Sequence, residues 1–229
     1  MNKCIGIAGG SGFLGKSLVK KLAKSGYKVK VFCRNYEKAK VLKIYGDPGQ
    51  IIIISGNINN QKNINLFVKG CDVIINLVAI FFEYGSQSFD NIHILAPKKL
   101  AESSREQGVS TFLHISNIGA DKNSISKSLK SRAYGELEVK KVFPQATIIR
   151  PSLIFGENDS FFFRFAKMSN FSPFLPVVNG GKNLFQPVFV DDISYAIYKI
   201  IKDKSLQGNI YELGGPKKYS FKSLLEYLL

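Results

Sequence analysis

Short apolar runs alternate with stretches of helical periodicity along the first 150 residues of this 229-residue chain. The apolar runs predict strands over residues 3–8, 28–33, 51–55, 73–77, 111–116 and 147–150. Between them, apolar residues that recur three and four positions apart predict helices over residues 12–25, 36–45, 61–68, 89–107 and 127–142. Alternating strands and helices indicate a parallel sheet covered on both faces, and the run 51–55 is apolar enough to be buried on both.

The residue pattern changes after Pro151, where prolines and phenylalanines become frequent. Asp191 and Asp192 are placed to cap a helix over residues 193–202, and residues 209–213 predict one more strand. An apolar helical pattern over residues 223–229 ends without a cap, so we expect the sequence to be truncated there.

The first predicted strand runs directly into a glycine-rich turn, Gly9-Gly10-Ser11-Gly12-Phe13-Leu14-Gly15, and a helix follows. This order suits a dinucleotide pyrophosphate, because backbone N–H groups in the turn approach the ligand and the helix N-terminus adds partial positive charge. The alternative is a loop that only needs flexible glycines. We therefore predict an α/β protein with a Rossmann-like doubly wound parallel sheet. Residues 1–150 form the nucleotide-binding domain, and residues 151–229 form a small loop-rich C-terminal cap packed on the sheet edge.

The end of the second strand bears on the choice of cofactor. Enzymes that use NAD usually carry Asp or Glu there, about 20 residues past the glycines, to bind the ribose 2′-hydroxyl. This chain has Cys33-Arg34 instead, and the planar guanidinium of Arg34 suits a 2′-phosphate. The sequence thus favours NADP(H) over NAD(H); the alternative is that Arg34 is an ordinary solvated arginine.

Composition adds a formal net charge of +15, which fits either an acidic partner or a general bias toward lysine, because the charge is scattered. Cys4, Cys33 and Cys71 predict buried free thiols in a reducing cytoplasm. Glycines interrupt the N-terminal apolar run, and the longest run, 73–82, is too short for a bilayer, so we expect no signal peptide and at most peripheral membrane association. His93 and His114 lack partners at ligand spacing, so we predict no metal site.

The segments 8–15, 56–58, 76–79 and 114–120 resemble motifs of the extended and atypical short-chain dehydrogenase/reductases, the NAD-dependent epimerase/dehydratase type. Within that family, the segments 149–156, 162–166 and 185–192 resemble the NADPH-binding accessory subunit of respiratory complex I and its bacterial relatives. The resemblance extends over essentially the whole chain. It implies cofactor contacts at Gly9, Ser11, Gly12, Phe13, Leu14, Gly15, Arg34, Asn57, Ile58, Leu77, Val78, Ala79, Arg132, Pro151 and Ile154.

The family's catalytic Tyr-x-x-x-Lys pair is not present in register. Alignment on Gly135-Glu136 puts Ser128 at the tyrosine position and Arg132 at the lysine position. An unactivated serine hydroxyl is a poor acid near neutral pH, whereas Arg132 still suits a ribose hydroxyl. Two weaker catalytic candidates remain, Tyr134 and Ser116. The alternative for Tyr134 is a residue that serves only packing, and the alternative for Ser116 is a polar residue that ends a strand.

The aromatic segments 161–165 and 171–175 leave three interpretations open: a core within the cap, a partner interface or a membrane-surface contact.

The resemblance implies an NADP(H)-binding accessory or assembly component of a respiratory NADH:quinone oxidoreductase. Such a protein would be cytoplasmic or lie at the cytoplasmic or matrix face of the respiratory membrane. Alternatives are an active NADP-dependent reductase or epimerase, and a nucleotide-sensing regulator. Nucleic acid is not an expected partner, because no helix-turn-helix or basic-aromatic strand pattern occurs.

Overall fold

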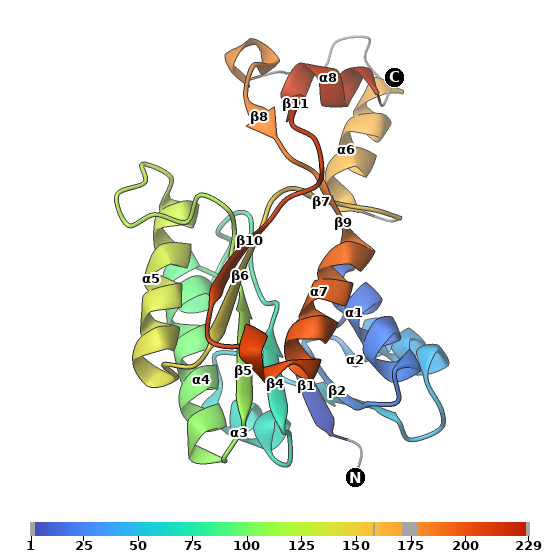
Figure 1. Ribbon diagram of the computed structural model, residues 1–229, viewed down its shortest axis with the longest axis vertical. Helices are drawn as coiled ribbons and strands as arrows, with labels where there is room; N and C mark the ends of the chain where they lie inside the picture. Colours follow the sequence, from blue (N-terminus) through green and yellow to red (C-terminus); the bar gives the residue numbers. More distant parts are fainter. Residues whose placement is uncertain (1–2, 158, 171–177, 228–229) are drawn as a thin grey trace.

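The computed structural model describes residues 3–157, 159–170 and 178–227. A layered α/β body carries a smaller lobe above one end of its sheet (Figure 1). None of the helices in these ranges is both long and apolar enough to cross a bilayer.

Seven parallel strands form the central sheet in the order β10-β6-β5-β4-β1-β2-β3. Their bounds are β1 Cys4–Ala8, β2 Lys28–Cys33, β3 Ile51–Ser55, β4 Val73–Asn76, β5 Thr111–Ile115, β6 Thr147–Pro151 and β10 Ile210–Leu213. The strand order reverses between β1 and β4, and a doubly wound sheet binds ligands in the crevice beyond the carboxyl ends of the strands at such a point. The predicted fold class is thus confirmed.

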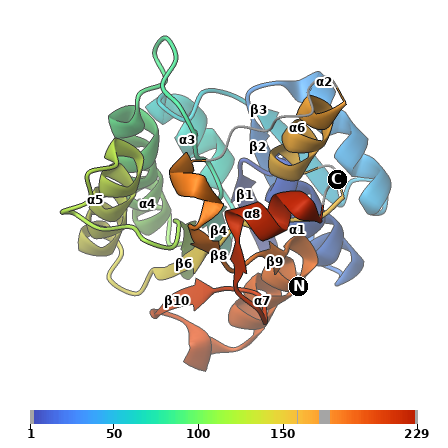
Figure 2. The same ribbon diagram turned by 90° about the horizontal axis from the view of Figure 1, so that it is seen from above.

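Helices cover both faces of the sheet, as Figure 2 shows from above. One face carries α1 (Phe13–Lys24), α2 (Tyr36–Ala39) and α7 (Val190–Lys202). The other face carries α3 (Gln61–Val68), the π-helical turn Asp90–Leu95, α4 (Ala96–Glu106) and α5 (Lys127–Val142).

Helix α1 illustrates how the sequence produces these layers. Leu14, Leu18 and Leu22 recur every four residues and are buried against the sheet, where each contributes about 1.5–3 kcal/mol. Gly26, with φ of +83°, follows the helix in the left-handed conformation that glycine adopts most easily. Because these leucines pack against the sheet, the N-terminus of α1 is held at the carboxyl end of β1.

Three sequence expectations are wrong in detail. The run 51–55 is an edge strand, so its isoleucines after Ile51 are only half-buried. The predicted helix 36–45 is α-helical only to Ala39; the 3-10 segment Lys40–Tyr45 has three residues per turn, which turns Leu42 and Tyr45 toward the same core.

The third correction concerns α7, which begins three residues earlier than predicted, at Val190. Asp191 and Asp192 therefore lie in its first turn rather than at its cap. The shift follows from packing, because Val190 and Ile193 are both buried. Asp191 instead accepts a hydrogen bond from the Ser17 hydroxyl on α1, at 2.6 Å.

The chain beyond residue 150 is divided between the body and the lobe. Helix α7 and strand β10 belong to the body, since β10 pairs in parallel with β6. The strand pair β7 (Ile154–Phe155) and β9 (Val188–Phe189) joins the two, because Ile154 and Val188 pack in the core of the body. The lobe comprises α6 (Ser160–Ser169), the 3-10 turn Val178–Gly181, β8 (Leu184–Phe185), β11 (Tyr219–Ser220) and α8 (Phe221–Glu226). A further 3-10 turn, Lys204–Leu206, precedes β10.

Aromatic rings make up much of the lobe's interior. Phe161, Phe165 and Phe185 all contact the ring of Phe221 on α8, with ring centroids 5.4–6.2 Å apart. These contacts favour the interpretation of segment 161–165 as cap core, although Phe163 is 59% exposed. The segment 171–175 lies outside the described residues.

Candidate dinucleotide-binding site

A cavity of about 310 Å³ lies at the carboxyl ends of β1, β2, β3 and β4. Many of the cofactor residues predicted from the sequence line it: Gly9, Ser11, Gly12, Arg34, Asn57, Ile58, Leu77, Val78 and Ala79. The prediction did not include the other lining residues: Phe32, Cys33, Gly56, Asn59, Ile80, Ser86, Gln87 and Ile92. Residues 80–92 follow β4, and only the order of strands in the sheet brings them over this cavity.

The glycine turn has the geometry that a pyrophosphate requires. Gly9 has φ of +82°, and its carbonyl accepts from the Gly12 N–H at 3.0 Å. A Cβ at Gly15 would lie 2.5 Å from the Gly10 carbonyl oxygen, so only glycine lets α1 start this close to the turn. A bound diphosphate fits this arrangement, because the tight turn, the open cavity and the N-terminus of α1 lie together.

Phe13, Leu14 and Gly15 do not line the cavity. Leu14 is buried in the core, and Phe13 packs against that core from the first turn of α1. Gly15 acts through close backbone packing rather than by exposing a surface.

Arg34 and Asn57 line the end of the cavity toward β2 and β3, the strands that they follow. The Arg34 guanidinium is exposed, and its Nη1 donates to the side-chain oxygen of Gln87 at 2.6 Å. The Asn57 side chain accepts from the N–H of Asn59, which fixes the loop after β3. This end therefore offers a cation and amide groups for the adenosine part of a dinucleotide.

The remaining predicted residues, Ser116, Arg132, Pro151 and Ile154, lie outside this cavity, near the carboxyl ends of β5 and β6. Ser116 Oγ is fully buried and has no hydrogen-bond partner among the described residues. Arg132 is 9% exposed, and the described part of the chain gives its guanidinium no hydrogen bond. Burial lowers the pKa of Arg132, and the nearby Glu136 partly offsets that effect. Two buried polar groups with free hydrogen-bonding capacity fit a ligand whose other end lies here.

Two buried histidines pack beside Arg132 as neutral hydrogen-bonding groups. His93 Nε2 accepts from the N–H of Ile80 at 3.2 Å, and its Nδ1 lies 2.9 Å from the Ser131 hydroxyl. His114 Nδ1 pairs with the Asn76 amide at 3.1 Å. The pKa of His93 is lowered to about 4 and that of His114 to about 3. Burial is the larger cause for both rings, and the positive charge of Arg132 is the second.

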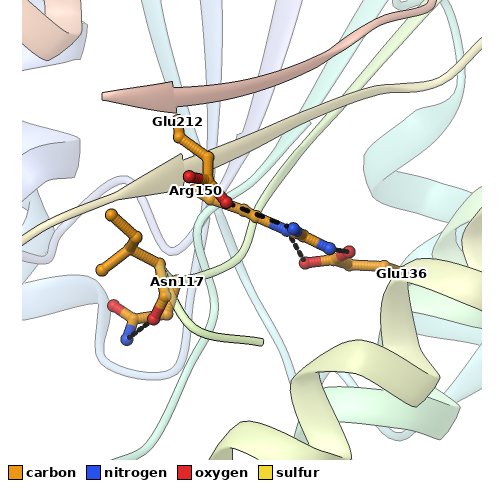
Figure 3. A network of polar contacts seen from close by, with 5 residues as sticks. Asn117, Glu136, Arg150 and Glu212 are labelled. Atoms are coloured by element: carbon orange, nitrogen blue, oxygen red, sulfur yellow. Dashed lines mark hydrogen bonds and ion pairs between the residues drawn. The ribbon is translucent and has the colours of Figure 1, made fainter. Parts of the chain in front are cut away.

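A buried ion pair ties α5 to the sheet behind this region (Figure 3). Arg150 on β6 donates from Nε and Nη2 to both carboxylate oxygens of Glu136, at 3.0 and 2.7 Å. Its Nη1 donates to Glu212 on β10 at 3.3 Å. Glu136 thus contacts Arg150 directly through both oxygens, and its negative charge also raises the pKa of the nearby Arg132.

Tyr134 and Ser128, the residues weighed for proton transfer, do not face the glycine turn. Tyr134 is 41% exposed and lines a separate hollow of about 300 Å³ together with Glu83, Lys127 and Lys130. Ser128 is half-buried, and its carbonyl accepts from the Ser131 hydroxyl at 2.8 Å. Neither residue lines the cavity built on the glycine turn.

The fold and cavity define a nucleotide-binding α/β protein, and comparisons with known proteins agree. Residues 9–157 match the model of the NAD(P)H-binding family. The chain belongs to this family, so its cofactor is a nicotinamide dinucleotide.

Similar proteins are found among respiratory subunits. Over 224 residues the chain is 36% identical to NADH dehydrogenase (ubiquinone) 1 alpha subcomplex subunit 9, mitochondrial, of Mus musculus. The aligned region covers 97% of this chain and 59% of that relative. It is 30% identical over 220 residues to the NADH-ubiquinone oxidoreductase 40 kDa subunit of Neurospora crassa, covering 96% of this chain and 58% of that protein. The chain thus spans less than two thirds of the length of these relatives.

The fold is shared with sugar-nucleotide enzymes. The crystal structure of dTDP-glucose 4,6-dehydratase from Streptomyces venezuelae with NAD bound superposes with a TM-score of 0.83 at 19% identity, over 99% of this chain and 80% of that one. At this identity the likeness establishes the fold, and the chemistry has to be argued from the site.

Proposed function

We propose that this protein binds NADP(H) as a structural cofactor and acts as an accessory or assembly component of a respiratory NADH:quinone oxidoreductase. The observation that carries the proposal is a dinucleotide cradle without the usual proton donor. The glycine turn and Arg34 border one cavity, whereas Ser128 and Arg132 occupy the positions at which the resembled family has its Tyr and Lys.

The NADP(H) preference rests on Arg34 and on the lack of a carboxylate at the end of β2. A guanidinium offers five donors to a phosphate dianion and no acceptor to a ribose hydroxyl. Among the described residues that line the cavity, Arg34 is the charged one.

Support for the respiratory role comes from the relatives, which are named as subunits of mitochondrial NADH dehydrogenase and align with nearly this whole chain. A bound dinucleotide would stabilise such a subunit by RT ln(1 + [L]/Kd), about 2.7 kcal/mol at a hundredfold excess over Kd. We place the protein at the cytoplasmic or matrix face of the respiratory membrane, as a peripheral component.

The respiratory role is tested by native electrophoresis of detergent-solubilised membranes from source cells that express a tagged form of the full-length protein. We expect the tag to co-migrate with NADH dehydrogenase activity, and to lose that co-migration when the enzyme's other subunits are absent. A tag found only as a monomer in the soluble fraction contradicts the role.

The runner-up function, an active reductase or epimerase, is tested on the same protein. We expect NADPH oxidation with a panel of carbonyl compounds to stay at background. Turnover that disappears in Tyr134→Phe would instead establish an active reductase and overturn the proposal of a held cofactor.

A further inference from the structure

The loop that follows β4 closes one side of the cavity with a short hairpin. Tyr84 and Gln87 exchange two backbone hydrogen bonds, at 3.1 and 3.0 Å, around Gly85 with φ of +57°. Ser86 and Gln87 at this turn line the cavity. The hairpin therefore presents a defined face to whatever occupies it.

The hairpin is anchored to the helix that follows it. Glu83 accepts from the N–H of Phe89 at 2.7 Å, and the Asn91 amide donates to the Ser86 carbonyl at 3.2 Å. These bonds, together with the two inside the turn, fix the backbone at Gln87. Its side chain is consequently positioned by the fold.

That side chain reaches across the cavity mouth to Arg34, 53 residues away in the sequence, where the Gln87 side-chain oxygen accepts from Arg34 Nη1 at 2.6 Å. Arg34 makes no other side-chain hydrogen bond among the described residues. A guanidinium has five N–H donors, so four remain for an anion. A primary amide carries two donors beside its oxygen, so Gln87 has N–H groups to add.

We propose that Gln87 and Arg34 together form the binding site for the 2′-phosphate of the dinucleotide. Gln87 is a positioning and specificity-determining residue: its oxygen orients the guanidinium, and its amide N–H₂ donates to the phosphate dianion. Two groups from separate elements then enclose the one feature that distinguishes NADPH from NADH. This inference deepens the proposed function and rests on its NADP(H) preference.

The test uses truncated ligands that differ only at the relevant group. Calorimetry of the full chain with 2′,5′-ADP and with 5′-AMP gives a ratio of affinities that reports the 2′-phosphate alone. In Gln87→Leu, we expect affinity for 2′,5′-ADP to fall tenfold to a hundredfold, the size of a lost hydrogen bond to a charged group. Affinity for 5′-AMP should change less than about threefold, because this substitution removes no interaction with the adenosine itself.

A second variant makes the prediction directional. In Gln87→Glu, a carboxylate would pair with Arg34 and repel the 2′-phosphate, so the preference for 2′,5′-ADP should disappear. NADH should bind at least as tightly as to the wild type, because a carboxylate accepts from the ribose 2′-hydroxyl. Ser86→Ala is the matched control: it lies in the same turn, lines the same cavity, and its side chain makes no hydrogen bond within the described residues.

Three outcomes overturn the inference. One is an unchanged affinity ratio in Gln87→Leu, and another is an equal loss of both ligands, which would mean that Gln87 only supports the hairpin. A Ser86→Ala control that lowers the ratio as much as Gln87→Leu is the third. If the wild type shows no preference for 2′,5′-ADP, the proposed NADP(H) function itself fails; if it prefers 2′,5′-ADP and the variants keep that ratio, only the role of Gln87 fails.

Discussion

Gly15→Ala is expected to lower the affinity for a nicotinamide dinucleotide by about a hundredfold or more. The added Cβ would lie 2.5–2.6 Å from three backbone atoms of Gly10, its oxygen, carbonyl carbon and Cα. Backbone cannot swing aside as the end of a flexible side chain can, so α1 and the glycine turn must separate. The turn then loses both the close approach of its N–H groups to the pyrophosphate and the adjacent helix N-terminus.

A control for Gly15→Ala lies at the other end of the same helix. Gly26 has a positive φ, +83°, and a Cβ there would meet nothing within 4 Å. Gly26→Ala should cost about 1 kcal/mol of unfolding free energy through backbone strain and leave the affinity unchanged. Calorimetry combined with thermal melts separates the two effects, and a folded Gly15→Ala protein that binds like the wild type would show that the turn is not the cradle.

Acidification from pH 6.5 to pH 5 is expected to lower the free energy of unfolding by about 3 kcal/mol through the two histidines. In the folded protein the pKa of His93 is lowered to about 4 and that of His114 to about 3, mainly by burial and then by Arg132. In the unfolded chain both titrate near pH 6.5.

The sign follows from which state binds more protons. Below pH 6.5 the unfolded chain takes up protons that the folded protein refuses, so stability falls by up to about 1.4 kcal/mol per pH unit for each histidine. This loss ends once the pH passes about 4 for His93 and about 3 for His114. The hydrogen bonds agree, because the Ile80 N–H requires an unprotonated Nε2 on His93.

Urea denaturation at several pH values measures this slope, and His93→Gln should remove about half of it. His114→Asn should remove the other half, since the chain has only these two histidines. A wild-type unfolding free energy that stays level between pH 7 and pH 5 would contradict the neutral state of both rings.

Local sequence signals were sufficient for elements whose ends are chemically marked. Helix α5 begins and ends at the predicted residues, because the Ser126 hydroxyl accepts from the N–H of Leu129 at its start. The predicted buried free thiols at Cys4, Cys33 and Cys71 are confirmed as well. The periodicity of the sequence also predicted the parallel sheet and thus the fold class.

Features that depend on the order of strands could not be predicted in this way. An apolar run such as 51–55 gives no sign that its strand lies at an edge. The hairpin with Gln87 lies in a segment without periodicity, and its place above the cavity follows only from the pairing of β4 with β1. The same holds for the separation of Tyr134 from the glycine turn, because a helix pattern does not say which residues its neighbours leave exposed.

The wild-type protein's affinities for NADPH and NADH, compared by calorimetric titration under identical conditions, most directly test whether this cradle holds NADP(H). We expect one NADPH per chain and at least tenfold weaker binding of NADH, because only NADPH offers Arg34 a phosphate dianion. Arg34→Ala should reduce the affinity for NADPH to that for NADH. Equal affinity of the wild type for the two dinucleotides, or no binding of either, would contradict the proposal.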